Sequence, residues 1–492
     1  MFFNSWPIRF LITRASRAYG FLDPVNLVAK IRGFAEPSEF AEPLELLRAG
    51  MLFHARGLVN TKAIQNNLDW VWPYWVERQF NPADDSFIPR AFSFSHINLT
   101  HRNWTAVGLP DVPFYPIVDP RGLVTPLFDG WSLDFWLVTP EGQVLLPSKL
   151  NDADFKQELS LETELHVTSR ATWPRGSLET DTSLSLYNHE PRCGVRARAV
   201  DLPAGYLAVS LRPYNPEGIS FIETVAVTED GCGWLINQRD SVLFDRKPER
   251  MVLSVYKHGD VAQQLVKPDA GARPRVNCEI GMVTAVALFD IQALGPHPLE
   301  LRAPIHDELT PKKRISVGEI SSWSDALAPM ARLQVEDARV QHLFEYATIN
   351  LVMHAPDEIY PGPYTYKRFW FRDAAFMLHA LLTLGGVDRT YKVMQHFAPR
   401  QRRDGYFLSQ EGEWDSNGEA IWTMHRYVLL TGSALPEKWL ESVAKGARWI
   451  MRKRLPRDTG RPEAGLLPAG FSAEHLGPND FYYWDDFWGV AG

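Results

Sequence analysis

The sequence predicts a multidomain β-then-α protein, in which an N-terminal antiparallel β-sandwich is followed by a partial (α/α)6 toroid. Residues 41 to 305 predict the sandwich, because short apolar segments there alternate with period two between turn-forming residues. Residues 335 to 492 predict the toroid, because amphipathic helices there alternate with helices that are apolar on nearly every face. A chain of 492 residues has room for both parts, since a domain averages roughly 150 residues.

The composition fits a soluble globular protein and excludes several other classes. A formal net charge of -8 without a basic block argues against a nucleic-acid partner. The cysteines, Cys193, Cys232 and Cys278, form no CxxC pair, which excludes a disulfide scaffold and a zinc signature. They favour a reducing compartment, so we expect a cytoplasmic protein. Residues 1 to 40 lack the features of a signal peptide, and we expect them to form a helical extension packed on the body.

The sandwich prediction rests on alternating strands and on regularly spaced turns. Val195 and Ala197 face one side of a predicted strand, whereas Arg196 and Arg198 face the other. Turn formers recur at 140–142, 203–205, 215–218 and 229–231. Many short strands with such turns are typical of an antiparallel sandwich. Residues 306 to 334 are charged and irregular, and we expect a linker there.

Six helices of two alternating types are predicted after this linker. The helix at 370–385 is apolar on nearly every face, so we expect other helices to bury it on all sides. It is too short to cross a bilayer, which needs about 20 apolar residues, and no integral membrane segment is expected. Gly385 is expected to end this helix in the left-handed conformation. The amphipathic, outer helices are 335–354, 388–398 and 437–454, and the apolar, inner ones are 370–385, 419–431 and a helix that begins near Trp484.

The connections between these helices predict where the functional residues meet. Residues 355–370, 400–418 and 455–483 are long, rich in aromatic and acidic residues, and each leads from an outer helix to an inner one. In successive antiparallel hairpins such loops all lie at the same end, the mouth of the toroid. A closed toroid of six hairpins needs roughly 200 residues or more. We therefore expect 335–492 to supply about three of the six hairpins of a longer enzyme.

Two clusters at this predicted mouth have residue types that bind sugars. In the first, Arg372 and Asp373 offer a fork of donors and a charged acceptor to neighbouring hydroxyl groups, with Trp370 beside them. In the second, Trp414 offers a flat apolar face to a sugar ring, and Asp415 follows it directly. Alternatively, Asp373 and Asp415 cap the helices that follow, and Arg372 is the ion-pair partner of Asp373.

A third cluster, Trp484, Asp485 and Asp486, is a candidate for acid catalysis. Aromatic residues on both sides of the two carboxyl groups would exclude water, which raises a carboxyl pKa towards the range of a general acid. Adjacent helical residues point about 100° apart, so only one of the two aspartates can face the reaction centre. Alternatively, both are solvated acids in a first helical turn, where the helix dipole favours them.

These motifs resemble those of the six-hairpin glycosidases. The resemblance rests on WFRDAAFMLHALLTLG, WDSNGEAIWTMHRYVLLTG and YYWDDFWGVAG. It is nearest to glucoamylase-like enzymes and to the amylo-α-1,6-glucosidase domain of glycogen debranching enzymes, some of which carry an N-terminal β-sandwich. It implies that Arg372 and Asp373 hold a terminal sugar, with Trp370 nearby, and that Asp485 or Asp486 is the general acid. It also implies that the catalytic base lies late in the barrel, beyond residue 492.

The resemblance implies a glycoside hydrolase that acts on α-glucosidic bonds of oligosaccharides or polysaccharides with inversion. Two alternatives remain, a disaccharide phosphorylase of the same architecture and a non-catalytic carbohydrate-binding protein. A phosphorylase would need a cationic phosphate site, for which Lys367 and Arg368 are candidates. No HExxH, P-loop or dinucleotide motif occurs, so no metal or other cofactor is expected. Because the expected base is missing, we expect residues 1–492 alone to turn over negligibly.

Overall fold

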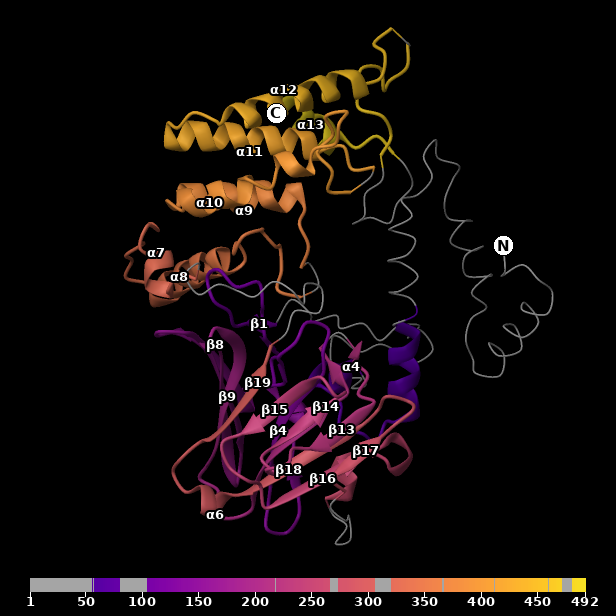
Figure 1. The fold of residues 1–492 in the computed structure, drawn as a ribbon, viewed down its shortest axis with the longest axis vertical. Helices are drawn as coiled ribbons and strands as arrows, with labels where there is room; N and C mark the ends of the chain where they lie inside the picture. The colour runs from indigo at the N-terminus through magenta and orange to yellow at the C-terminus, as the bar shows by residue number, and fades with distance from the viewer. Residues whose placement is uncertain are drawn as a thin grey trace, which may run out of the picture. The chain divides into compact units, whose positions relative to one another are not determined.

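The computed structural model describes residues 55, 57–79, 104–216, 218–265, 273–305, 320–364, 367–410, 412–458, 460–470 and 480–492 (Figure 1). The chain forms two compact units. We call Val59–Arg368 the sandwich unit, and we call Phe369–Gly492, the C-terminal part of the second unit, the helical unit. The helical extension predicted for residues 1–40 lies outside the described residues.

The first large sheet of the sandwich unit is antiparallel. Within the described residues its strand order is β1-β2-β3-β4-β10-β18-β16, and β5 also pairs with β4. Its central strands pair in register from Tyr206 opposite Val138 to Arg212 opposite Ser132. The strands are β1 (Thr105–Ala106), β2 (Ile117–Val118), β3 (Val124–Thr125), β4 (Ser132–Val138), β5 (Val144–Leu145), β10 (Tyr206–Arg212), β16 (Arg250–Ser254) and β18 (Thr284–Asp290).

The second large sheet is also antiparallel, in the order β17-β13-β14-β15-β19-β9-β8-β7-β6. Its longest strands, β8 and β9, are joined by Asn188 and His189, whose φ angles of 49° and 72° suit the two-residue turn of a hairpin. The strands are β6 (Phe155–Leu161), β7 (Leu165–Trp173), β8 (Gly176–Tyr187), β9 (Glu190–Val200), β13 (Thr224–Val227), β14 (Gly233–Ile236), β15 (Asp240–Phe244), β17 (Arg275–Asn277) and β19 (Leu299–Pro304). A small separate pair consists of β11 (Tyr214–Asn215) and β12 (Gly218–Ile219).

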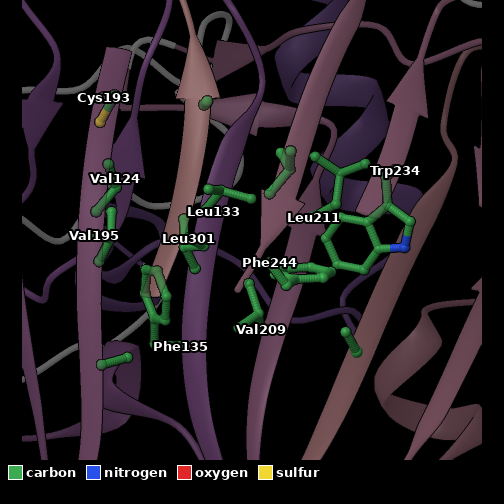
Figure 2. Packing of buried hydrophobic residues seen from close by; sticks show 14 of the residues in the cluster. Val124, Leu133, Phe135, Cys193, Val195, Val209, Leu211, Trp234, Phe244 and Leu301 are labelled. Carbon is green, nitrogen blue, oxygen red and sulfur yellow. The ribbon is translucent and has the colours of Figure 1, made fainter. Parts of the chain in front are cut away.

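The two large sheets pack face to face around one hydrophobic core (Figure 2). The core contains Leu133 and Phe135 of β4 from the first sheet and Trp234 of β14 and Val195 of β9 from the second. Because alternate residues of a strand share a face, Val195 and Ala197 lie in the core together. The antiparallel sheets predicted from the period-two pattern are therefore confirmed.

The outer face of the first sheet is covered by a segment that the sequence analysis placed in the all-β region. Residues 57–66 are helical, and α4 spans Tyr74–Gln79. The intervening Val71 packs with Trp136 of β4 in a second cluster, together with α5 (Val261–Gln264). The prediction of strands from residue 41 was wrong here, because a short apolar run such as 70–76 has no period that separates strand from helix.

A buried ion pair fixes this covering segment to the sheet. The Arg212 guanidinium is fully buried, pairs with Asp260 and donates from Nη2 to the carbonyl oxygen of Val71 at 2.7 Å. The Val71 N–H in turn donates to Asp260 Oδ2 at 2.8 Å. A buried charge needs such a partner, since an unpaired one would carry a large desolvation cost. The remaining short elements of the unit are α6 (Ile291–Leu294), η4 (Pro147–Lys149), η5 (Asp152–Asp154) and η6 (Tyr256–His258).

The first predicted outer helix belongs to the sandwich unit. α8 (Ala338–Met353) agrees with the helix predicted at 335–354, but the boundary between the units lies after Arg368. Tyr115 fixes the end of α8, because its hydroxyl donates to the Met353 carbonyl oxygen at 3.0 Å. Of the predicted linker, residues 320–334 are described and include α7 (Trp323–Leu327).

The helical unit follows the predicted helix pattern. Gly385 ends α9 with a φ of 93°, as predicted. α11 packs against α9, α10, α12 and α13 and is the centre of the unit. None of the helices in the described part of the chain is long and apolar enough to cross a membrane. The helices are α9 (Phe371–Thr383), α10 (Val387–Met394), η8 (Ala398–Arg400), α11 (Ser416–Thr431), α12 (Glu437–Lys453) and α13 (Tyr483–Ala491).

The predicted β-then-α order is confirmed, and one detail of the helical unit is corrected. α9 is not buried on all sides, since Phe376 is 51% exposed. α11 covers the face of α9 that carries Ala374, Ala375 and Leu378, whereas Phe376 is covered only in part, by Trp484 and Trp488 of α13. An apolar composition thus shows which residues can be buried but not which neighbour covers them. Closure of these helices into a toroid remains a prediction.

Candidate active site

Three helices of the helical unit bring residues from their N-terminal ends to one point. Arg372 lies in the first turn of α9, Asp415 directly precedes α11, and Trp484 lies in the first turn of α13. Arg372 donates from Nε and Nη2 to Asp415 Oδ2 at 3.0 and 2.9 Å, and Trp484 Nε1 donates to the same oxygen at 2.9 Å. One carboxylate oxygen therefore joins residues from all three predicted clusters.

This arrangement differs from the alternative interpretation, in which Asp373 and Asp415 only cap their helices. Asp415 occupies the N-cap position of α11, but its side chain makes no capping hydrogen bond and accepts from Arg372 instead. In α9 the N-cap position is held by Trp370, and Asp373 lies half-buried in the first turn, where a carboxylate interacts favourably with the helix dipole. Arg372 thus pairs with Asp415, which is 43 positions away. Asp415 makes no capping hydrogen bond, and Asp373 does not occupy the N-cap position.

The site is rich in carboxylates around a single described guanidinium. Glu413 Oε1 lies 3.9 Å from Arg372 Nη2, and Glu413 is itself buried. Although burial of Arg372 disfavours its charge, the carboxylates of Asp415 and Glu413 raise the pKa of Arg372 above its ordinary value. Arg372 therefore carries a full positive charge and offsets part of the negative charge around it.

Asp485 is the carboxyl group at this site that suits acid catalysis. It is only 5% exposed. Burial and then the negative charge of Asp415 raise the pKa of Asp485 to about 8, while the Trp414 backbone N–H and Arg372 oppose the rise. A carboxyl with a pKa of about 8 holds its proton at pH 7, which is the state that a general acid needs.

Asp486 is bound to the backbone of the preceding loop. Its Oδ1 accepts a hydrogen bond from the Leu467 backbone N–H at 2.9 Å and so holds the loop before α13. Burial raises the pKa of Asp486 moderately, and the hydrogen bond from Leu467 and the charge of Arg454 oppose this. The choice that the sequence left open between the two aspartates therefore favours Asp485.

Two of the three tryptophans predicted at the site, Trp414 and Trp484, differ in accessibility. Trp414 is 2% exposed, its ring packs against Tyr406 and Trp449, and Lys453 Nζ lies 3.8 Å from the ring centroid. Its faces are occupied, so it does not offer the predicted stacking surface. Trp484 is 41% exposed, and the Arg372 guanidinium lies 5.6 Å from its ring centroid. A ligand can therefore reach Trp484 but not Trp414, and Trp370 is half-buried.

Glu413 and Glu419 also belong to this cluster, although the sequence did not predict them as site residues. Glu419 lies in the first turn of α11 and is fully buried. A signal was present in the sequence, because residues four apart share one face of a helix, which places Glu419 beside Asp415. Within the described residues, no three His, Cys, Asp or Glu side chains are grouped so that they could hold a metal ion.

Gly418 allows α13, which carries Asp485, to approach α11. A Cβ atom at residue 418 would lie 2.0 Å from the backbone oxygen of Trp488, which cannot move as a side chain can. We expect Gly418→Ala to destabilise the protein by about 1–3 kcal/mol or more, as overpacking does, and urea unfolding measures this. The matched control is Gly489→Ala on α13, where a Cβ would make only ordinary contacts of 3.6 and 3.7 Å. Equal stability of the two variants would contradict this packing.

Comparisons with known proteins support the fold. No protein-family model and no curated protein sequence matches the chain. A solved structure of a bacterial glucoamylase complexed with acarbose is similar, with a TM-score of 0.53 and 12% identity over 79% of this chain and 66% of that one. The chain therefore spans just under two thirds of that glucoamylase.

A second similarity is weaker. A family GH92 α-mannosidase from Bacteroides thetaiotaomicron aligns with 75% of this chain and 61% of its own, at 9% identity and a TM-score of 0.27, which is too low to indicate a shared fold. At 12% identity the glucoamylase similarity concerns the fold alone. The chain thus has a β-then-α fold that is similar to the fold of this glucoamylase.

Proposed function

We propose that the chain is part of a glycoside hydrolase that cleaves α-glucosidic bonds with inversion, of the glucoamylase or amylo-α-1,6-glucosidase type. The observation that carries this proposal is Asp485, a buried carboxyl with a pKa of about 8 beside Arg372 and Asp415. The fold similarity to a glucoamylase supports the same class of reaction. On this proposal α9 to α13 form part of an (α/α)6 toroid, and the site lies at its mouth.

Each residue at the site has a distinct proposed role. Asp485 protonates the glycosidic oxygen as the bond to the anomeric carbon breaks, which is the task of the acid in an inverting enzyme. Arg372 and Asp415 bind sugar hydroxyl groups, with Asp373 and Trp370 beside them at the same helix end. The exposed ring of Trp484 stacks on an apolar sugar face.

Inversion also needs a base that activates water. The base is a second carboxylate, and the two carboxyl groups of inverting enzymes lie about 6.5–9.5 Å apart. Asp415 is held by Arg372 and Trp484, and Glu413 lies against Arg372. We therefore propose that the base is none of these residues. A chain without its base would bind sugar but cleave it slowly, so binding and turnover have to be measured separately.

The test uses the 492-residue chain with maltotriose and acarbose. Calorimetry is expected to show binding of both. Glucose release to water is expected to be negligible without the base, and any glucose that does form is expected to appear first as the β-anomer in proton NMR. Added azide, a nucleophile that needs no base, is expected to increase cleavage if the base is missing. If neither maltotriose nor acarbose binds, the proposal is contradicted.

The same assay distinguishes the two alternatives. Product that forms only with phosphate, as glucose 1-phosphate, would identify a phosphorylase. Binding without cleavage, with or without phosphate and azide, would identify a carbohydrate-binding protein. The described residues give no support to a phosphate site at Lys367, because its ammonium lies 5.3–5.7 Å from the centroids of three aromatic rings of the sandwich unit.

A further inference from the structure

Glu419 is a buried carboxyl group without a hydrogen-bond donor. Its side chain is fully buried in the first turn of α11. Neither Oε1 nor Oε2 accepts a hydrogen bond from any N–H or O–H group in the described part of the chain. A buried carboxylate left in this condition would carry a large desolvation cost, which a protein avoids by keeping the group neutral.

The neighbours of Glu419 oppose a negative charge. Asp415 precedes it by one helical turn, and a hydrogen bond between the two side chains is among the causes that raise the pKa of Glu419. Two ionised carboxylates only accept hydrogen bonds, so a bond between them requires a proton on one of the two. Asp415 Oδ2 already accepts from Arg372 and Trp484, which stabilises the ionised form of Asp415. The proton therefore belongs on Glu419.

The charges that face Glu419 agree with this assignment. Burial is the main cause that raises the pKa of Glu419 well above its ordinary value, and the charge of Asp415 and the hydrogen bond to it add to the rise. Glu413 raises the pKa further, and Arg372 is the cation that opposes it. Asp485, another acid of the site, has a pKa of about 8 and so holds its proton at pH 7. If Glu419 were also ionised, its charge would be opposed, within the described part of the chain, only by Arg372, which already pairs with Asp415 and Glu413.

We propose that Glu419 is a positioning residue, which carries a proton at neutral pH and donates a hydrogen bond through it to Asp415. The shared proton fixes the Asp415 carboxylate so that its Oδ2 receives Arg372 and Trp484 from the two neighbouring helices. The pair carries one negative charge, balanced by Arg372. The consequence for sugar binding rests on the proposed function, whereas the location of the proton does not.

Replacement of Glu419 by glutamine tests the location of the proton. A glutamine Nε2–H group can donate to Asp415 as the protonated acid does, and Glu437→Gln on the exposed start of α12 is the matched control. In infrared spectra at neutral pH, Glu419→Gln is expected to lose one carbonyl band of a protonated carboxylic acid. The control is expected to lose none.

Stability gives a second measurement that is independent of sugar. A carboxyl whose pKa is raised in the folded protein contributes stability below its unfolded pKa, and this contribution is lost as pH rises through the folded value. The wild-type melting temperature is therefore expected to fall relative to that of Glu419→Gln from about pH 4.5 upwards. Parallel pH profiles and an unchanged infrared spectrum would overturn the proposal, as would failure of Glu419→Gln to fold.

Sugar affinity tests the positioning role. Glu419→Gln is expected to bind acarbose as wild type does, whereas Glu419→Leu, which cannot donate, is expected to bind about tenfold more weakly. Equal affinity of Glu419→Leu and wild type would overturn the positioning role. If wild type itself does not bind sugar, the proposed function fails, and the infrared and stability results still decide where the proton lies.

Discussion

Asp485→Asn is expected to reduce azide-supported cleavage of maltotriose by about 10²–10⁴-fold, the usual contribution of a general acid, while acarbose affinity changes little. Asparagine keeps the size and an acceptor oxygen of aspartate, so the hydrogen bond from the Trp414 backbone N–H can persist. It cannot release a proton to the glycosidic oxygen. Initial rates with maltotriose and calorimetry with acarbose, measured on the same preparation, separate the chemical step from binding.

The neighbouring residue supplies the matched control. Asp486→Asn has the same change in charge one position away, and asparagine can still accept from Leu467 through Oδ1. We expect this variant to retain most of the activity. If Asp486→Asn loses activity and Asp485→Asn keeps it, the assignment of the acid is reversed, and the burial argument for Asp485 fails.

The pH dependence of activity follows from the same carboxyl. Because burial raises the pKa of Asp485 to about 8, the protonated fraction falls as pH rises through about 8. Activity is therefore expected to decline on the alkaline side with an apparent pKa near that value. Stability is expected to fall earlier, as pH rises from about 4 to about 8, because in that range the folded protein holds a proton that the unfolded chain has released. A rate profile that is flat from pH 7 to pH 9 would contradict this role.

The sequence was sufficient to predict the elements that carry the site. The period of apolar residues predicted the helices at 370–385 and 419–431, and loop lengths predicted that their N-terminal ends would lie together. Arg372, Asp415 and Trp484, which lie far apart in the chain, do meet there. This succeeded because helix direction and loop length depend on local sequence, and they restrict which ends can meet.

The partners of individual side chains could not be predicted in the same way. Trp414 and Trp484 each precede an aspartate, yet one is enclosed by Tyr406 and Trp449 and the other is exposed. Helical period gives the face on which Glu419 lies but not the absence of a donor in the packing around it. These properties depend on which helices are neighbours, and that information comes only from the three-dimensional structure.

Arg372→Ala is expected to lower stability by about 3–5 kcal/mol, because it leaves the buried Asp415 carboxylate without its cation. Sugar binding is expected to be lost as well, since Arg372 is a proposed hydroxyl-binding residue. Urea unfolding measures the first effect and calorimetry with acarbose the second. Arg372→Lys is expected to recover stability only in part, because an ammonium cannot reproduce the two hydrogen bonds from Nε and Nη2.

A double-mutant cycle separates the ion pair from the packing of the arginine side chain. In an Asp415→Asn background the unpaired negative charge is absent, so Arg372→Ala is expected to cost much less there than in wild type. The difference between the two costs is the coupling energy of the pair. A cost that is equal in both backgrounds would mean that Arg372 contributes by packing against Trp484, and that Asp415 does not depend on it. A large coupling energy with lost acarbose binding would instead show that the same pair that joins α9 to α11 also organises the sugar site.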